Sequence, residues 1–452
     1  MQSGVTPRLL NVNRFKRRIN RQDPVANIYR NAIDLNRFSN GVARQIVRDY
    51  NNIILSAVAD LKAIDLGEAT AGAGIVSPQS VQAQRLRVIL AQLKQSLDAW
   101  SGRSTAYVAR ELQGLAELQT EFITEQLKLA IEGGQVGARG IEPSVVAQRV
   151  VNTVEVAPNF AATVATVDPT DVSLVVPLSN ARVLGAIPGQ VPTTVTFNLT
   201  AAEGATLTLP NGQIIEKVFR GLAESQAQRF NTIVRTGLLT GEPTPQIARR
   251  LVGNLNFGQL AKTARQQALA GGELTKAADH QVLTLVRTSV QQVANAASEQ
   301  VYKTNQDVTQ KYRYVATLDS RTSAICASLD GKEFEYGKGP QPPIHFNCRS
   351  TTVPIVDYEG LGLTPPEKVI GIGKRASAEG PVPANVTYGK WLQGQSKDYQ
   401  EKVFRSDRRA AYFRKLSNKY GPQDALVRMV REDGSEVTLA QLQRSYGKVR
   451  VD

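Results

Sequence analysis

The residues with the clearest chemical potential lie together between Ile325 and Ser350. This stretch holds both cysteines of the 452-residue chain, Cys326 and Cys348, and His345, one of only two histidines. A His-x-x-Cys spacing lets an imidazole and a thiolate from one turn face the same metal ion. The stretch therefore predicts a compact Cys/His knot, with Cys326, His345 and Cys348 as candidate zinc ligands.

The number of donors leaves several kinds of site open. A structural zinc site has four ligands, so Asp319, Asp330, Glu333 or a water would have to complete the set. Three protein ligands plus water is the arrangement of catalytic zinc, a cysteine nucleophile with a histidine base is another option, and a disulfide is a further one. We favour a structural knot, with or without zinc, because no second histidine lies near the cluster and no oxyanion-hole glycine pattern accompanies it.

The charge balance points to an anionic partner. The chain carries a formal net charge of +14 and a pI near 9.7, which favours nucleic acid among polyanions, although simple solubility also explains it. Residues 1–30 hold seven Lys and Arg residues against one acid and form a predicted basic arm. Its densest part, Arg14, Lys16, Arg17 and Arg18, is the candidate nucleic-acid contact, with a solvated tail as the alternative.

Helical periodicity dominates the elements that must position the knot. In residues 31–142, apolar residues recur three or four apart, as at Leu35, Phe38, Val42 and Ile46, which predicts a domain of long antiparallel helices. Residues 143–212 are rich in Val and Thr and read as a small β-rich insertion. The fold class is therefore α+β and predominantly α-helical, with a compact α/β knot near the C-terminal third.

The remaining chain divides into two segments. Residues 213–360 begin with a helix over 215–239, continue with a long helix over roughly 274–305 and a strand near 311–319, and end with the knot. Residues 361–452 are a Pro/Gly-rich connector followed by a smaller helical unit, in which Phe404, Tyr412 and Phe413 alternate with basic residues. Phe404, Ala411, Tyr412 and Leu416 fit one helix face, so a packed core is favoured over stacking of the aromatics on bases.

Composition excludes several classes of protein. No window of eighteen uninterrupted apolar residues predicts a transmembrane helix, and the basic N-terminus lacks the apolar stretch of a secretory signal. Two cysteines in a chain of this length favour a reducing compartment over a disulfide-stapled secreted protein.

The motifs "VRTSVQQVANAASEQVY", "YVATLDSRTSAICASLDGKEF" and "PPIHFNCRSTTVPI" together resemble the phage Mu F-like head morphogenesis proteins. The matching positions are Arg287 and Thr288 in the helix, Asp319, Arg321, Thr322, Cys326, Leu329, Asp330 and Gly331 after the strand, and Pro343, His345, Cys348 and Arg349 in the last block. The resemblance covers about Gln213–Gln443. The family usually carries another cysteine where Ser350 stands, so one sulfur ligand is missing here.

The resemblance implies a structural minor head, or minor capsid, protein of a tailed phage and not an enzyme. Implied partners are the portal protein, the major capsid protein or both, with contact to packaged DNA and no membrane. Implied locations are the head interior or portal vertex of the virion, in multiple copies, and the host cytoplasm during assembly. Genome packaging or ejection are implied roles, and one zinc ion is the only cofactor in question.

Within the resemblance, the motif residues are expected to act structurally. Asp319 and Arg321 would pair across a turn, and Arg349 would donate a bidentate contact. The alternatives to a head protein are a zinc-dependent nuclease-like enzyme and a general DNA-binding protein.

Overall fold

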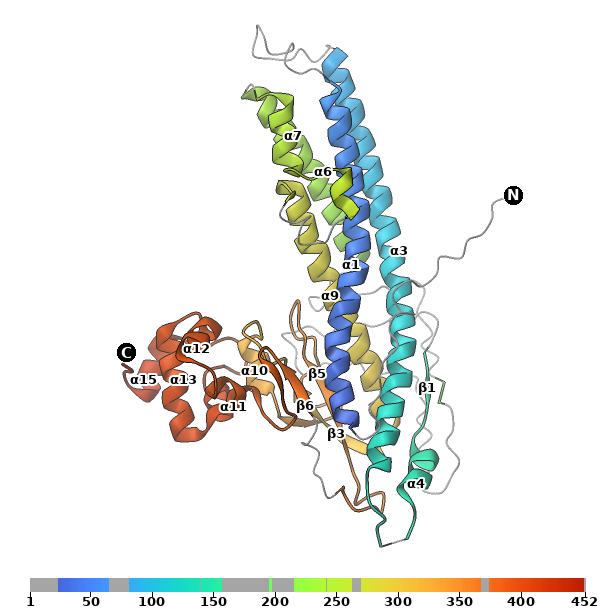
Figure 1. Ribbon diagram of the computed structural model, residues 1–452, viewed down its shortest axis with the longest axis vertical. Helices are drawn as coiled ribbons and strands as arrows, with labels where there is room; N and C mark the ends of the chain where they lie inside the picture. The colour runs from blue at the N-terminus through green and yellow to red at the C-terminus, as the bar shows by residue number, and fades with distance from the viewer. Residues whose placement is uncertain are drawn as a thin grey trace, which may run out of the picture.

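The computed structural model describes residues 23–64, 81–138, 140–156, 195–196, 215–240, 242–261, 270–366 and 374–450. Within these ranges helices predominate and the sheets are small (Figure 1), which confirms the predicted fold class. None of the described helices combines the length and the apolar character needed to cross a bilayer.

Four long helices form the body of the molecule. They are α1 (Pro24–Lys62), α3 (Val81–Glu132), α6 (Ile215–Leu239) and α9 (Glu273–Thr304). Their apolar faces share one core, in which Trp100 makes a tilted contact with the ring of Tyr50 and an edge-on contact with that of Phe219. Its indole N–H donates to the carbonyl of Ile46 at 3.1 Å. Two shorter elements, α7 (Thr244–Val252) and the 3₁₀ helix η2 (Phe257–Ala261), pack against this bundle.

Helix α1 begins inside the segment predicted as a basic arm. Asp23 caps it by accepting the N–H of Ala26 at 2.8 Å, and Pro24 follows at a position where a missing N–H costs nothing. The predicted boundary at residue 30 was therefore wrong, because Arg30 lies one and a half turns into the helix. Arg14, Lys16, Arg17 and Arg18 lie outside the described residues.

The predicted β-rich insertion is only partly described. Its first residues form a helix, α4 (Pro143–Val150), which packs against α3 and corrects the expectation of strands there. Proline at the first helical turn and burial of Val146 and Ala147 favour the helix despite the valines. The described strands are β1 (Val154–Glu155) and β2 (Val195–Thr196), which pair in parallel. The Val- and Thr-rich stretches behind the prediction otherwise lie outside the described residues.

A three-stranded antiparallel sheet packs against one end of α9. Its order is β4 (Glu333–Glu335), β3 (Thr309–Val315), β5 (Thr351–Val356), with the short helix α10 (Ala324–Leu329) between β3 and β4 in the chain. The central strand carries Tyr312 and Tyr314, both fully buried. A hairpin of β6 (Lys374–Ser377) and β7 (Gly380–Pro383) then leads away from the sheet.

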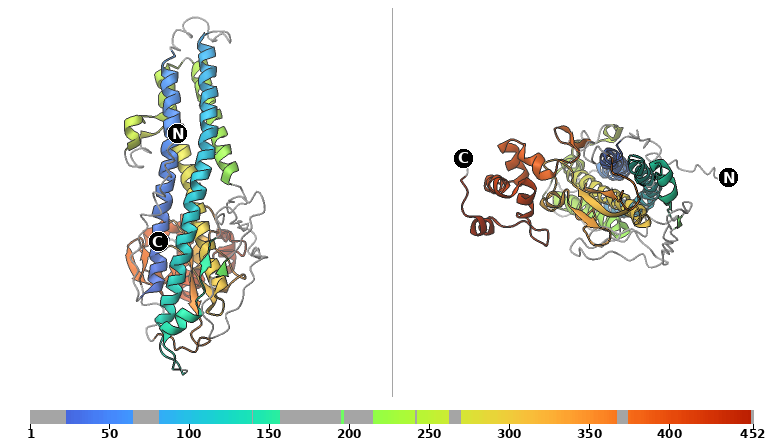
Figure 2. Two further views of the ribbon diagram at one scale, coloured as in Figure 1. Left: turned by 90° about the vertical axis from the view of Figure 1, so that its right-hand side faces the viewer. Right: turned by 90° about the horizontal axis from the view of Figure 1, so that it is seen from below.

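The C-terminal helices form a separate unit beside the bundle (Figures 1 and 2). They are α11 (Tyr388–Gln393), α12 (Lys397–Phe404), α13 (Asp407–Tyr420), α14 (Pro422–Val427) and α15 (Leu439–Tyr446). The unit has its own core, in which Tyr412 and Phe413 are buried and Phe404 partly buried. These aromatics pack inside the unit, so stacking on bases is not their role.

One buried carboxylate joins this unit to the sheet. Asp330, with no exposed surface, accepts both guanidinium nitrogens of Arg375 from β6 at 2.9 and 3.1 Å. It also accepts the N–H of Ala316 at 2.7 Å, just after β3, and the N–H of Tyr388 at 2.6 Å, at the start of α11. Arg375 in turn donates to the carbonyls of Ala316 and Val386 and lies over the ring of Tyr29 in α1. The three segments therefore meet on a single ion pair.

We expect Asp330→Ala to destabilise the protein by about 3–5 kcal/mol, because it leaves the Arg375 guanidinium buried without a counter-charge. Urea unfolding followed by tryptophan fluorescence would measure the loss, since Trp391 lies in the C-terminal unit. Glu333→Gln is the matched control. Its partner Arg313 is bonded at 2.7 Å but partly exposed, so a loss of at most about 1 kcal/mol is expected. Equal losses in the two variants would contradict the role of Asp330.

Candidate functional site

The structure brings the three predicted donors into one cluster. The sulfur of Cys326 lies 3.8 Å from that of Cys348 and 3.2 Å from Nε2 of His345, and the three ligand atoms lie within 4.8 Å of one another. Both cysteines are free thiols and only 2% exposed, whereas His345 is half-buried. The predicted Cys/His knot is therefore confirmed as a cluster, and the two cysteines form no disulfide in this structure.

Local structure fixes each donor. Ser323 caps α10 by accepting the N–H of Cys326 at 3.3 Å, which places that cysteine in the first turn of the helix. Nε2 of His345 lies 2.8 Å from the same serine hydroxyl, and its Nδ1 lies 2.8 Å from the carbonyl of Phe346. The Nδ1 proton thus points to Phe346, which turns Nε2 toward the sulfurs.

The two cysteines and the histidine change one another's pKa. The Cys326 thiol donates toward Cys348 and holds the pKa of Cys348 well below its ordinary value, and the His345 imidazole adds to this effect. Burial and the neighbouring Cys348 raise the pKa of Cys326. Burial lowers the pKa of His345, but the adjacent sulfur of Cys348 outweighs it and the pKa rises. The three groups therefore shift one another's pKa values: that of Cys348 falls, and those of Cys326 and His345 rise.

A polar stripe on α9 holds the loop that carries Cys348. Thr288 accepts the N–H of Asn347 at 3.0 Å, and Thr284 accepts from the side-chain amide of Asn347 at 3.2 Å. About one turn beyond Thr288, Gln291 donates to the carbonyl of Ser350 at 2.7 Å. The backbone of Asn347 is left-handed, with φ 56°, a conformation that asparagine tolerates better than most residues.

Asn295 completes the stripe. Its amide donates to the carbonyls of Gln291 and Ser350, and its oxygen accepts the hydroxyl of Thr351. The stripe residues are spaced four, three and four apart, so they lie on one face of the helix. The motif residue Thr288 therefore acts by docking the loop, since its only described bonds go to the backbone of Asn347 and to its own helix.

An ion pair between Asp319 and Arg349 also holds the knot, in addition to the polar stripe on α9. The guanidinium donates to both carboxylate oxygens, at 2.5 and 2.8 Å, which is the bidentate contact expected of Arg349. Arg321 reaches the same carboxylate at 3.4 Å from an exposed position, so it is the looser partner. Burial raises the pKa of Asp319, but the Arg349 guanidinium outweighs it and holds the pKa below its ordinary value.

The remaining motif residues also make internal contacts. Arg287 donates from two nitrogens to Oδ1 of Asn40 and so ties α9 to α1. Thr322 donates to the carbonyl of Thr317 at 2.5 Å. Gly331 has φ +81°, a conformation that suits glycine, in the turn before β4. The predicted motif residues therefore lie in one region, but each is occupied by a structural bond.

The donor geometry fits three positions of a zinc site. Two sulfurs on tetrahedral zinc lie about 3.8 Å apart, given Zn–S bonds of about 2.3 Å, and Cys326 and Cys348 are at this spacing. None of the predicted completing carboxylates is available. Asp319 is paired with Arg349, Asp330 with Arg375 and Glu333 with Arg313. If zinc binds, Cys326, His345 and Cys348 would hold it and the ion would supply a fixed cross-link.

The serine at the fourth family position faces the cluster. Ser350 is 1% exposed, and its side chain lies close enough to Cys326 and Tyr314 to oppose the rise in the pKa of each group. Tyr314 lies 3.3 Å from the same sulfur. Sequence reasoning missed Ser323, Ser350 and Tyr314 as neighbours of the sulfurs. Only Ser350 had a signal, since it stands where the family carries a cysteine.

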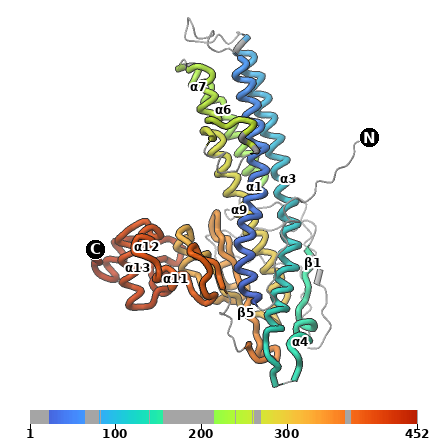
Figure 3. Tube along the Cα trace, in the orientation of Figure 1, coloured from blue at the N-terminus to red at the C-terminus, as the bar shows by residue number. Residues whose placement is uncertain are grey.

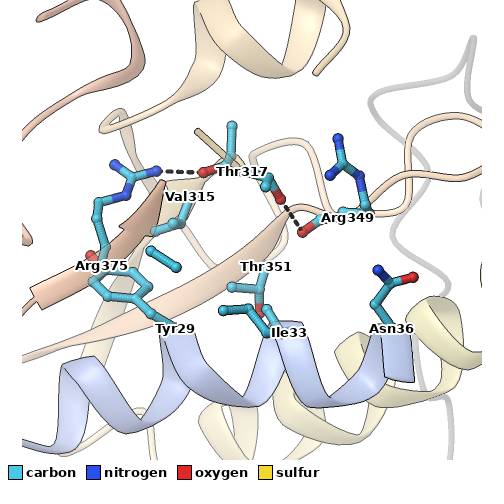
Figure 4. Close-up of a pocket in the computed structure, with 11 residues that line it drawn as sticks. Tyr29, Ile33, Asn36, Val315, Thr317, Arg349, Thr351 and Arg375 are labelled. Carbon is cyan, nitrogen blue, oxygen red and sulfur yellow. Dashed lines mark hydrogen bonds between the residues drawn. The ribbon is translucent and has the colours of Figure 1, made fainter. Parts of the chain in front are cut away.

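A small cavity lies beside the knot, between α1 and the sheet (Figure 4). Tyr29, Ile33 and Asn36 line it from α1, and Arg349 and Arg375 lie at its wall. Its volume of about 100 Å³ admits a few waters but not a nucleotide. Both guanidiniums are engaged by carboxylates, so the cavity offers no free charged group for a substrate.

Comparison with known proteins places the site within a recognised domain. Residues 228–353 match the family model described as Phage Mu protein F like protein, which confirms the resemblance over this range. An uncharacterized protein of Haemophilus influenzae is 32% identical over 109 residues, which covers 21% of this chain and 24% of that protein. The match thus spans about a quarter of the relative's length. No solved structure matches the chain. The predicted resemblance from residue 354 to Gln443 stays a prediction.

We expect Thr288→Val to cost about 1–3 kcal/mol, because the N–H of Asn347 loses its acceptor while its surroundings keep their shape. Unfolding in urea would measure the loss, and faster amide exchange at residues 347–351 would locate it. Thr105→Val is the control, since the hydroxyl of Thr105 bonds only to a carbonyl of its own helix. A loss no larger than that of the control would contradict the docking role.

We expect Ser350→Cys to raise the zinc affinity of the chain by at least about tenfold, because it adds a fourth sulfur beside the three donors. Competition with a chromophoric chelator would measure the affinity, and the cobalt spectrum would report the number of sulfur ligands. Ser328→Cys adds a buried cysteine outside the cluster and serves as the control. If neither the native chain nor Ser350→Cys bound zinc, the three donors would be a hydrogen-bonded knot alone.

Proposed function

We propose that this chain, whose residues 228–353 carry a Phage Mu protein F-like domain, is a structural minor head protein of a tailed bacteriophage. It would act in head assembly at the portal vertex or capsid interior, in multiple copies, with the portal protein or major capsid protein as partner. The observation that carries the proposal is that the domain's motif residues build a closed scaffold. Arg287, Thr288, Asp319, Asp330 and Arg349 all bond to other parts of the chain.

The burial of the donor cluster supports a structural role over catalysis. Catalytic zinc requires an open position for water or substrate, and a nucleophilic cysteine requires access. Cys326 and Cys348 are each 2% exposed, and the nearby carboxylates are committed to arginines. The buried thiols therefore lack the access that attack on a substrate requires. A nuclease-like enzyme is the less favoured function.

The shape of the molecule also supports a scaffold. At about 1.5 Å per residue, the 52 residues of α3 span roughly 78 Å, and β5, the strand that follows the knot in the chain, lies beside the lower part of the bundle in Figure 3. The C-terminal unit extends to the side of this rod. Such a molecule presents well-separated surfaces, which suits a protein that bridges other subunits.

We expect purified virions to contain this chain, and phage lacking it to yield defective or non-infectious heads. Mass spectrometry of virions would detect the chain, and electron microscopy with plaque counts would measure the defect. A chain with His345→Ala and normal thermal stability separates the alternatives, because a structural protein has no DNA cleavage to lose. Normal heads without the chain would contradict the proposal, and cleavage abolished by His345→Ala would favour the enzyme.

A further inference from the structure

The C-terminal unit holds a disproportionate share of the positive charge. Between Tyr388 and Arg450 there are fourteen Lys and Arg residues and seven Asp and Glu residues. This stretch of 63 residues therefore carries a net charge of +7, half of the +14 of the whole chain. Its core is apolar and closed, so the charge lies on its surface.

The cations gather on one face. Arg408, Lys415 and Lys419 are exposed and are spaced seven and four residues apart on α13, which places them on one side of the helix. Lys415 donates to the carbonyls of Tyr446 and Lys448 at 2.6 and 3.2 Å. The segment after α15 therefore lies against this side of α13 and brings the exposed Lys448 to it.

An aromatic pair anchors the end of this face. The guanidinium of Arg428 lies 4.0 Å from the centre of the Tyr420 ring, and Nζ of Lys419 lies 5.1 Å from it. Tyr446 meets Tyr420 edge-on, with the ring centres 6.5 Å apart. We call the exposed set of Arg408, Lys415, Lys419, Arg428 and Lys448, which extends from the start of α13 to Tyr420 at its end, the cationic face.

Carboxylates neutralise other arginines of the unit but not this face. Arg409 pairs with Glu436 and Arg414 with Glu401, and both arginines lie roughly 100–120° around α13 from Lys415, at about 3.6 residues per turn. Within the described residues, no cation of the cationic face has a carboxylate within ion-pair distance. The nearest described acids along the chain are Asp407, whose carboxylate accepts the N–H of Arg408, and Asp424 and Glu432, each four residues from Arg428. The face therefore keeps its charge.

We propose that the cationic face binds the sugar-phosphate backbone of double-stranded DNA. A protein partner would need apolar anchors at the centre of its contact, and no large exposed apolar side chain of the described chain lies between Tyr388 and Arg450. A polyanion needs only closely spaced cations, and it releases counterions when it binds them. The contact is independent of base sequence, because no groove-reading element accompanies the face. This proposal rests on the proposed function as a head protein. It places the contact with packaged DNA on the C-terminal unit, whereas the sequence alone suggested the N-terminal arm.

The test compares full-length variants that lose equal charge. Arg408→Gln, Lys419→Gln and Arg428→Gln together remove three cations of the face while leaving Lys415 to hold the C-terminal segment. Fluorescence anisotropy with a labelled 30-base-pair duplex, over a range of salt, would give the affinity and its salt dependence. We expect a loss of roughly a hundredfold near 0.1 M salt and a fall of about 2–3 in the slope of log K against log salt, at about 0.9 for each phosphate contact.

Two further variants make the result specific. Lys390→Gln, Lys397→Gln and Lys402→Gln remove three exposed cations from α11 and α12 of the same unit, and we expect at most a severalfold loss. Arg408→Lys, Lys419→Arg and Arg428→Lys keep the charge and should retain the slope. Thermal unfolding would show that all three variants are folded.

Three outcomes would overturn the proposal. They are no DNA binding by the native chain at low salt, equal losses in the test and control triples, or complete loss on changing Arg14, Lys16, Arg17 and Arg18 to Gln with the cationic face intact. None of these bears on the proposed role in head assembly, which the analysis of virions tests separately.

Discussion

The ion pair between Asp330 and Arg375 is the constraint on which the arrangement of the molecule depends. A buried carboxylate is stable only when its charge and its lone pairs are met, and here two guanidinium nitrogens and two backbone N–H groups meet them. These donors come from three different places along the chain, at Ala316, Arg375 and Tyr388. The pair therefore fixes where β3 ends, where β6 lies and where the C-terminal helices begin.

The Cys/His knot is also held by polar contacts between segments that are distant in the sequence. Side chains of α9 hold the loop at Asn347 and Ser350 mainly through its backbone, and Thr284 adds a bond to the side-chain amide of Asn347. The Asp319–Arg349 pair then closes the knot from the other side. The polar atoms of the motif bond to other parts of the chain and so stabilise a scaffold. Binding of a partner would therefore involve the outer surfaces of the protein.

Sequence patterns foresaw the elements whose signals are local. The apolar spacing placed α6 and α9 within a residue of their ends, and nearness along the chain placed the three donors together. The start of α1 was missed although Asp23 and Pro24 carry a cap signal, because the basic charge of the segment drew the boundary instead. A polar stripe on α9 can be recognised from the spacing of Thr284, Thr288, Gln291 and Asn295. The spacing does not show which loop the stripe binds, because that contact forms only in the folded chain. Arg375 had no signal, since it meets Asp330 from 45 residues away.

Helix α9 is shared by two parts of the molecule. One face packs in the common core with α1 and α3, and another holds the knot. The recognised domain begins at residue 228, inside α6, and does not contain α1 or α3. The matched range is therefore smaller than the set of helices that share the core, and an excised fragment of residues 228–353 would expose the apolar side of α9 to water. In this chain, α1 and α3 are the helices that cover that side.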